Sequence, residues 1–357
     1  MSRTIPIALG ERAYDVIVAA DFSELARAFQ RATTASRAVL VTDETVAPLW
    51  ADEATAALGV RVDRVVLEVS EARKDVAAWS ALVDHLLDLG VDRRTPVVAL
   101  GGGVVGDIAG FGAAVTLRGL PFVQLPTTLL AMVDSSVGGK TGVNHRRGKN
   151  LIGAFHQPRL VFAALHTLAT LDPAERIAGL GEVLKTALVG DAELLTFLDE
   201  KAEALRVGDR DAVLHVVSRC IEIKAEVVAI DEREGGWRAV LNAGHTVAHG
   251  YEMAAGYGVI RHGEAVAMGL VAETAWAVQS GHCKDRDLPA RLVDIAGRLG
   301  LRTNAPELPR ERVLAGMQVD KKRRGDILVL PVPLGAGTMK LVEFPANALS
   351  DLLPETP

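Results

Sequence analysis

Three histidines and one glutamate have the residue types and the spacing that metal-dependent chemistry needs. His245 and His249 are four residues apart, so a helix over this segment would place both imidazoles on one face. His262 stands at the start of the next expected helix, and Glu182 lies in the helix expected after residue 171. Two imidazoles and one carboxylate with an open coordination position are typical of a catalytic zinc site. These residues therefore predict a metal site.

Spacing alone leaves two questions about this metal site open. It does not decide which two of the three histidines bind the ion, and it also fits histidines that are satisfied in a core or exposed at the surface. Thr246 follows His245, so the HExxH motif of zinc proteases is absent. Three of the nine histidines nevertheless fall between residues 245 and 262, in glycine-flanked sequence, and this clustering favours a metal site.

A second candidate site lies in the glycine-rich stretch 96–158. An apolar run leads into three glycines and an expected helix, and Gly101, Gly103 and Gly106 match the spacing of a dinucleotide-binding fingerprint. A strand, a glycine turn and a helix N-terminus together bind phosphate. The usual acid about 20 residues downstream is absent, but Asp43 follows an expected strand and could accept hydrogen bonds from ribose hydroxyls. The alternative is that these glycines only permit tight packing of a strand against a helix.

A set of basic residues suggests an anionic substrate. Each one taken alone is explained as well by a solvated surface charge. Together they fit a ligand that carries phosphate, carboxylate or both. Most of the run 320–324 is expected to be a solvated loop, with one lysine reaching the pocket. The residues of this set stand beside glycines or at helix starts and are Arg118, Lys140, Lys149, Lys185, Lys224, Arg238 and Lys321.

Composition excludes several classes of protein. The 357 residues are more than one ordinary core holds, so two domains are expected. An apolar fraction of 49% is typical of a packed globular enzyme, and a net charge of −6 disfavours nucleic-acid binding. Two cysteines imply no disulfide framework. Neither a signal peptide nor a run of about 18 apolar residues is evident, so we expect a cytoplasmic protein that does not enter a membrane.

The expected fold is α/β followed by α. Up to residue 171, apolar strands alternate with helical segments, which predicts a Rossmann-like, mostly parallel sheet with helices on both faces. From there to about residue 316 almost every segment has helical spacing, and two short strands, 326–331 and 339–344, follow. We therefore expect a nucleotide-binding α/β domain over 1–171 and a mainly helical metal- and substrate-binding domain over 172–357. The expected helices are 21–32, 44–58, 73–90, 174–190, 191–206, 210–231, 240–256, 262–281 and 287–300.

Taken together, these sites resemble those of the 3-dehydroquinate synthases, of the sugar-phosphate cyclase family. The resemblance covers almost the whole chain in order and rests on long, specific motifs. They are GGGVVGD (101–107), RG (118–119), LPTTLLAMVDSSVGGKTGVN (125–144), GKNLIGAFHQP (148–158), GEVLKTA (181–187), EIKAEVVAIDERE (222–234), RAVLNAGHTVAH (238–249), RHGEAVAMG (261–269) and DKK (320–322).

The resemblance implies a reaction, two cofactors and an assembly. The reaction converts 3-deoxy-D-arabino-heptulosonate 7-phosphate into 3-dehydroquinate and phosphate, in the shikimate pathway to aromatic amino acids. It runs by transient oxidation with NAD, elimination of phosphate, re-reduction and intramolecular aldol closure. A divalent ion, Zn²⁺ or Co²⁺, would act as the Lewis acid. The small-molecule partner would be an anionic sugar phosphate, and the protein would be a homodimer.

Site roles follow from the same resemblance, motif by motif. The metal ligands would be Glu182, His245 and His262, and His249 would face the substrate. Either His249 or a metal-ordered water would move the hydroxyl proton. Glu234 would support the substrate cluster. The NAD contacts would be Asp43, Glu71, Lys74, Gly102, Gly103, Val104, Gly106, Asp107, Thr127, Thr128, Asp134, Lys140, Lys149 and Thr170. The substrate contacts would be Arg118, Asp134, Lys140, Asn150, Lys185, Lys224, Arg238, Asn242, His249 and Lys321.

Two other enzymes fit the same motifs less well. A sibling cyclase that makes a valiolone or a deoxy-inosose would not need Arg238 and Asn242 to bind a carboxylate. A metal-dependent polyol dehydrogenase of related fold would not need so many cations and would accumulate NADH. A non-catalytic NAD-binding regulator is a third alternative, which the intact set Glu182, His245, His262 and Lys185 disfavours.

Overall fold

The chain forms two compact units in the computed structural model, which describes residues 2–256, 258–304, 307–318, 323–324 and 326–354. The first unit comprises Met1–Asp172 and one stretch of a later helix, Lys224–Ala229. The second comprises Pro173–Ile223 and Ile230–Pro357. Among the described residues, no helix has the length and apolarity that a bilayer crossing requires.

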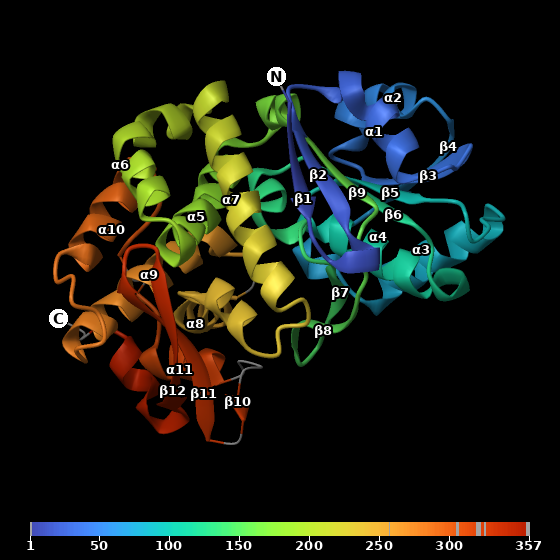
Figure 1. Cartoon of the computed structure of the whole chain (residues 1–357). Helices are drawn as coiled ribbons and strands as arrows, with labels where there is room; N and C mark the ends of the chain where they lie inside the picture. The colour runs from blue at the N-terminus through green and yellow to red at the C-terminus, as the bar shows by residue number, and fades with distance from the viewer. Residues whose placement is uncertain (1, 257, 305–306, 319–322, 325, 355–357) are drawn as a thin grey trace. The chain divides into compact units, whose positions relative to one another are not determined.

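A seven-stranded sheet organises the first unit (Figure 1). Its strand order is β1-β2-β9-β6-β5-β3-β4, and every neighbouring pair except β1 with β2 is parallel. Strands β3, β5 and β6 therefore end at the same edge, where a parallel sheet places its ligands. The strands are β1 Arg3–Ile7, β2 Tyr14–Ala19, β3 Arg37–Asp43, β4 Arg61–Leu67, β5 Val97–Gly101, β6 Phe122–Pro126 and β9 Leu160–Ala164.

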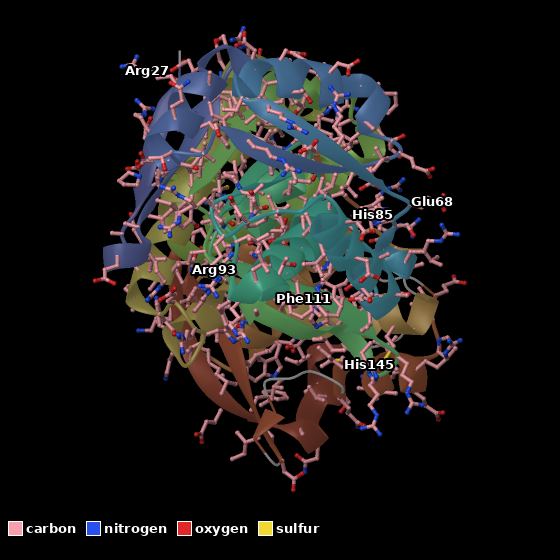
Figure 2. All side chains as sticks on the ribbon, turned by 90° about the vertical axis from the view of Figure 1, so that its right-hand side faces the viewer. Arg27, Glu68, His85, Arg93, Phe111 and His145 are labelled. Atoms are coloured by element: carbon pink, nitrogen blue, oxygen red, sulfur yellow. The ribbon has the colours of Figure 1, made fainter. Side chains whose placement is uncertain are left out.

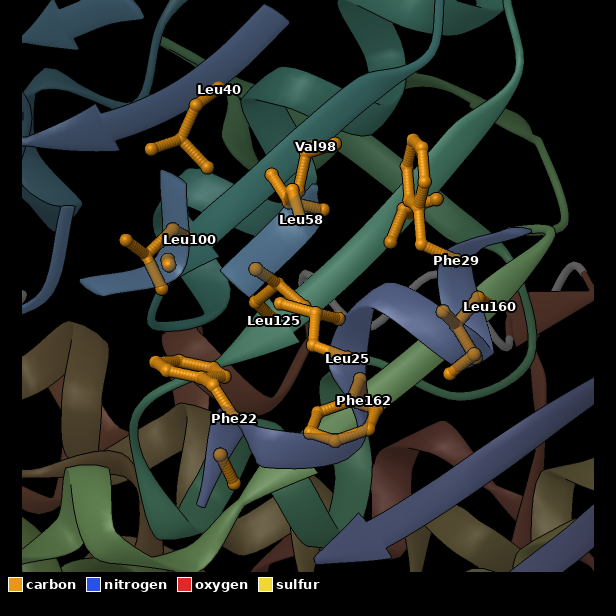
Figure 3. Packing of buried hydrophobic residues seen from close by; sticks show 14 of the residues in the cluster. Phe22, Leu25, Phe29, Leu40, Leu58, Val98, Leu100, Leu125, Leu160 and Phe162 are labelled. Atoms are coloured by element: carbon orange, nitrogen blue, oxygen red, sulfur yellow. The ribbon is translucent and has the colours of Figure 1, made fainter. Parts of the chain in front are cut away.

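Helices cover both faces of this sheet, because the central strands are apolar on both sides. Leu40, Val98 and Phe162 pack under α1 (Leu25–Ala32) and α2 (Ala47–Leu58), and Figure 3 shows this cluster. The alternate residues of β3 and β5 pack under α3 (Val76–Asp88) and α4 (Gly103–Val115). Charged side chains such as Arg27 and Glu68 lie on the outside (Figure 2). Burial on both faces explains why these strands show no polar alternation and confirms the expected α/β class.

The stretch after β6 contains strands that the glycine and lysine pattern did not predict. β7 (Lys140–His145) and β8 (Gly148–Phe155) form an antiparallel hairpin, and β9 then inserts between β2 and β6. Between β6 and β7, Ala131–Ser135 form a turn of π-helix. Such turns occur often at functional sites.

The second unit is mainly helical, as expected, with a small sheet near its end. One expected helix, 240–256, is wrong as a single element: a 3₁₀ helix, η7 (Trp237–Asn242), ends before Gly244, whose φ of 77° breaks the helix ahead of α8. The strands β10 (Arg323–Arg324), β11 (Ile327–Gly335) and β12 (Thr338–Pro345) form an antiparallel sheet. The helices are α5 Pro173–Gly190, α6 Ala192–Val207, α7 Arg210–Ile230, α8 His245–Ala255, α9 His262–Gln279, α10 Leu288–Arg298 and α11 Arg310–Gln318.

Candidate active site

Three side chains of the second unit converge in one cluster. Glu182 lies in the middle of α5, His245 is the first residue of α8, and His262 is the first residue of α9. One ligand atom from each lies within 4.8 Å of the other two. Within the described part of the chain, this is the cluster whose residue types and distances could hold a metal ion.

Neighbouring acceptors orient both imidazoles. Nε2 of His262 lies 3.2 Å, and Nε2 of His245 lies 3.7 Å, from the same oxygen of Glu182. On the other side of each ring, Nδ1 faces an acceptor: the carbonyl of Ala243 at 3.1 Å for His245, and the carboxylate of Glu252 at 3.4 Å for His262. Hydrogen bonds of this kind set the tautomer and direction of metal-binding histidines. The donor set therefore fits a zinc-like ion.

The electrostatics of the cluster also fit a cation. Glu182 is fully buried and forms an ion pair with Lys185, which is itself buried. Burial lowers the pKa of His262, but hydrogen bonds and charge from Glu182 and Glu252 outweigh it and raise that pKa to about 10. The imidazole of His262 therefore keeps its proton between the carboxylates of Glu182 and Glu252. A divalent ion would be stabilised by the same negative charge.

His249 lies beside the cluster rather than within it. Its ring centroid is 5.5 Å from that of His245 and 6.5 Å from that of His262. The side chain is half-buried. Of the three histidines, His245 and His262 face Glu182 together, which makes them the candidate pair of metal ligands. This arrangement leaves His249 close enough to contact a ligand bound at the cluster.

Close backbone contact between helices holds Glu182 and His262 near each other. A Cβ atom added to Gly263 would lie 1.7 Å from the carbonyl oxygen of Ala178, so only glycine allows this approach. Gly263 directly follows His262, and Ala178 lies one helical turn before Glu182. The packing of α5 against α9 therefore fixes the separation of these two candidate ligands.

The glycine stretch of the first unit forms a strand–turn–helix, as the fingerprint predicts. β5 ends at Gly101, Gly102 is the N-cap of α4, and the amide of Thr127 donates to the carbonyl of Gly101 at 3.0 Å. A Cβ on Gly102 would lie 3.0 Å from the methyl group of Thr128. The first amides of a helix have no acceptor within the helix, and α4 has no side-chain cap, which fits a pyrophosphate at its N-terminus. A Cβ added to Gly106 would meet the side-chain oxygen of Gln124 at 2.8 Å, so this glycine also lets α4 pack closely against β6.

A network of polar side chains surrounds the buried Lys74. Its ammonium pairs with Asp107 and donates to the side-chain oxygen of Asn150 at 2.7 Å. Asn144 joins the network, donating to Glu71 at 3.0 Å and accepting from the amide of Asn150 at 2.9 Å. Burial raises the pKa of Asp107, although Lys74 opposes this. Glu71, Lys74, Asp107 and Asn150, which lie in three separate stretches of the sequence, are thus brought together.

Lys224 is one of the residues of α7 that pack with the first unit. Its ammonium donates to the carboxylate of Asp134 at 2.6 Å and to the carbonyl of the same residue at 2.5 Å. Asp134 lies in the π-helical turn. A buried cation thus has the anionic partner that its apolar surroundings require.

Apart from Arg118, the remaining predicted residues of the first unit lie around the carboxyl ends of the strands or at the β7–β8 hairpin. Arg118 ends the 3₁₀ turn between α4 and β6, so it lies near the amino end of β6, at the opposite edge of the sheet. Asp43 accepts from the amides of Thr45 and Val46 at 2.8 and 2.9 Å, so its carboxylate already stabilises the turn that precedes α2. Thr170 accepts from the indole of Trp50 at 2.9 Å. The other positions are Val104 in the first turn of α4, Thr128 capping the next turn, Arg118 with a φ of 67°, Lys140 at the start of β7, and Lys149, 3.9 Å from Glu71.

Besides Lys185 and His249, the predicted substrate residues of the second unit that the structure describes lie in and just before η7, where Arg238 is buried and Glu234 and Asn242 are half-buried. Arg238 is 1% exposed and donates to the carbonyl of Glu232. Asn242 donates to the carboxylate of Glu234 at 2.8 Å, and Glu234 adopts a positive φ of 57°. This positive φ, strained for a non-glycine residue, marks a segment held in place by its contacts. Lys321 lies outside the described residues.

Two residues of this site were missed from the sequence. Glu252 follows His245 and His249 at the i, i+4, i+7 spacing of one helix face, and this periodicity could have identified it. Asn144 lies within one of the motifs used for the resemblance, but its position in the sequence does not indicate that it takes part in a site.

Comparison with solved structures places the fold among NAD-linked cyclases and dehydrogenases. The 2-epi-5-epi-valiolone synthase of Streptomyces hygroscopicus, solved with NAD⁺ and Zn²⁺, is 32% identical over 95% of each chain, with a TM-score of 0.85. A 2-deoxy-scyllo-inosose synthase, solved with carbaglucose-6-phosphate, NAD⁺ and Co²⁺, gives a TM-score of 0.87 at 24% identity, over 98% of this chain and 99% of that one. A glycerol dehydrogenase of Schizosaccharomyces pombe gives 0.65 at 16% identity, over 94% and 86%. The last two likenesses show the fold alone.

Sequence comparison defines the family. Two family descriptions, 3-dehydroquinate synthase N-terminal and 3-dehydroquinate synthase C-terminal, match residues 64–178 and 179–323. A 3-dehydroquinate synthase of Pelobacter propionicus is 42% identical over 352 residues, which are 98% of each chain. The chain therefore belongs to the 3-dehydroquinate synthase family.

Proposed function

We propose that this protein is a 3-dehydroquinate synthase, a phosphorus–oxygen lyase that depends on NAD and a divalent metal. Its substrate would be 3-deoxy-D-arabino-heptulosonate 7-phosphate, and its products 3-dehydroquinate and phosphate. The observation that carries the proposal is the cluster of Glu182, His245 and His262, in a chain 42% identical to the Pelobacter enzyme over 98% of its length.

Glu182, His245 and His262 would hold the metal, and Lys185 would balance the charge of Glu182. When bound, the metal polarises a substrate oxygen and NAD accepts and returns a hydride. His249 is half-buried beside the cluster, so we assign it the transfer of the hydroxyl proton. Glu252 would keep His262 turned toward Glu182, since it lies 3.4 Å from the opposite ring nitrogen.

NAD binding is assigned to the first unit. The N-terminus of α4 would bind the pyrophosphate, and Asp43 would accept from a ribose hydroxyl. The network around Lys74 supports this assignment, because its polar groups hold one another in fixed positions next to α4. The full set of proposed contacts is Asp43, Glu71, Lys74, Gly102, Gly103, Val104, Gly106, Asp107, Thr127, Thr128, Asp134, Lys140, Lys149 and Thr170.

Substrate binding is assigned to the cations and amides that a dianionic sugar acid needs. Arg238 and Asn242 suit a carboxylate, and the lysines suit a phosphate. A substrate with two anionic groups explains why so many basic residues are needed at one site in a chain whose net charge is −6. The proposed contacts are Arg118, Asp134, Lys140, Asn150, Lys185, Lys224, Arg238, Asn242, His249 and Lys321, with Glu234 supporting Asn242.

The decisive assay supplies the heptulosonate phosphate with NAD and Zn²⁺ and follows phosphate, dehydroquinate and NADH together. We expect phosphate and dehydroquinate in equal amounts, no accumulated NADH, and loss of turnover after chelation. Net NADH formation would indicate a dehydrogenase, and absence of phosphate release would rule the proposal out.

One alternative has an observation of its own. The 32% identity to the valiolone synthase, over 95% of each chain, fits a sibling cyclase. A sugar phosphate that lacks the carboxylate separates the two activities. We expect it to be a poor substrate, and turnover preferring it over the heptulosonate phosphate would favour the sibling.

Assembly and location complete the proposal. By likeness to the family we propose a homodimer in the cytoplasm. Light scattering of the purified chain tests the first, and fractionation of cells that produce it tests the second.

A further inference from the structure

Glu273 is a buried carboxylate that has no role in the proposed reaction. It lies on α9, eleven residues after His262, and is 2% exposed. One of its oxygens accepts from the amide of Gly244 at 2.7 Å, and the other accepts from the amide of Val247 at 3.2 Å. Both amides belong to the start of α8. A charged side chain of one helix thus binds the N-terminus of another.

The start of α8 needs such a partner. The first amides of a helix have no acceptor within the helix, and they carry the positive end of its dipole. A serine, threonine or aspartate at the N-cap normally accepts from them. The N-cap of α8 is Gly244, which has no side chain to offer. Glu273 performs this function from α9, and its negative charge matches the dipole.

The segment that Glu273 binds carries a proposed metal ligand. His245 is the first residue of α8 and stands between the two amides that Glu273 accepts from. The contact is reinforced by backbone packing: a Cβ on Gly269 of α9 would lie 1.9 Å from the carbonyl oxygen of Gly244. A movement of the α8 start would therefore break both hydrogen bonds and turn the His245 ring away from Glu182.

We propose that Glu273 is a positioning residue of the metal site. By binding the first turn of α8 to α9, it sets the direction of His245 relative to His262, the ligand that begins α9. This inference deepens the proposed function, because it rests on the assignment of Glu182, His245 and His262 as ligands. Residues that orient metal ligands typically change metal affinity about 10- to 100-fold when replaced.

The test compares two substitutions of a capping carboxylate by its amide. Glu273→Gln keeps the side-chain size but directs an NH₂ group at backbone N–H donors. Asp191→Asn is the matched control: Asp191 caps α6 by accepting from the amides of Glu193 and Leu194 at 2.9 and 3.0 Å, and α6 carries no proposed ligand. The full-length chains are loaded with Zn²⁺, and the zinc dissociation constant is measured by competition with a chelator.

We expect Glu273→Gln to weaken zinc binding about tenfold or more and Asp191→Asn to leave zinc binding unchanged. This difference should hold even if both variants have a lower melting temperature than the wild type. Equal zinc affinity in the two variants would overturn the proposal, since Glu273 would then contribute only stability. If Glu273→Gln does not fold, Glu273→Asp applies the same criterion, because it keeps the charge and withdraws the carboxylate by one methylene. Failure of the wild-type chain to bind zinc through His262 would instead contradict the proposed function.

Discussion

The two candidate sites of this protein are built in different ways. The metal cluster consists of side chains from three helices, each turned by a buried neighbour such as Glu252. The cofactor cradle consists of backbone at the end of β5 and the start of α4, with a polar network beside it. We therefore expect loss of one side chain to abolish metal binding at the cluster. At the cradle we expect NAD binding to depend on the space above Gly102 and on the ion pair of Lys74 with Asp107.

The largest expected effect is removal of a metal ligand. We expect His262→Ala to lose bound zinc and to slow phosphate release on the order of 10³-fold, because Lewis-acid stabilisation is worth several kcal/mol. Zinc content by mass spectrometry and a phosphate assay measure this. His249→Ala is the control and should slow phosphate release while keeping its zinc. Unchanged zinc content in His262→Ala would remove His262 from the ligand set.

Breaking the buried ion pair beside the cradle should cost stability. We expect Lys74→Met to lower the free energy of unfolding by about 3 kcal/mol, since it leaves Asp107 buried without its cation. Urea denaturation measures this. Adding Asp107→Asn should restore part of the loss, because the remaining charge is removed. An unchanged unfolding midpoint in the single variant would mean that the pair carries no net stability.

A larger side chain at Gly102 should weaken NAD binding and leave zinc binding unchanged. Gly102→Val places methyl groups against Thr128, whose methyl group would lie only 3.0 Å from an added Cβ, and such overpacking costs about 1–3 kcal/mol. We expect the NAD dissociation constant to rise about tenfold, with zinc content unchanged. Gly297→Val is the control, because an added Cβ there meets nothing within 4 Å. Equal NAD affinity in both variants would contradict a pyrophosphate site at the start of α4.

The smallest effect is expected at Asp191, which belongs to neither site. Burial would raise the pKa of this carboxyl, but hydrogen bonds from Arg219 and the Leu194 amide outweigh it and lower the pKa. A carboxylate with a lowered pKa stabilises the fold above its unfolded pKa, and this stability disappears as the pH falls through the folded pKa.

We therefore expect Asp191→Ala to destabilise by about 1 kcal/mol at pH 7 and the difference from wild type to shrink below about pH 4. Urea titrations across that range measure it, with zinc and NAD binding unaffected. A difference that grows on acidification would show that the sign of the pKa shift is wrong. A fall in zinc or NAD affinity would show that α6 is coupled to one of the sites.

Local sequence determined much of this molecule. The apolar runs of β3, β5 and β6, most helices of the second unit and the glycine turn before α4 follow from periodicity and from the conformational range of glycine, which act over a few residues. The types and spacing of Glu182, His245 and His262 likewise suffice to suggest a metal.

Only the tertiary structure decided how these parts meet. It inserted β9 between β2 and β6, ended η7 before Gly244, and turned His245 rather than His249 toward Glu182. It also brought Glu273 to the start of α8. Spacing reports which residues share a face of one element, whereas these contacts join residues of different elements. They depend on how closely the backbones approach, which glycine contacts between helices set and which no local pattern encodes.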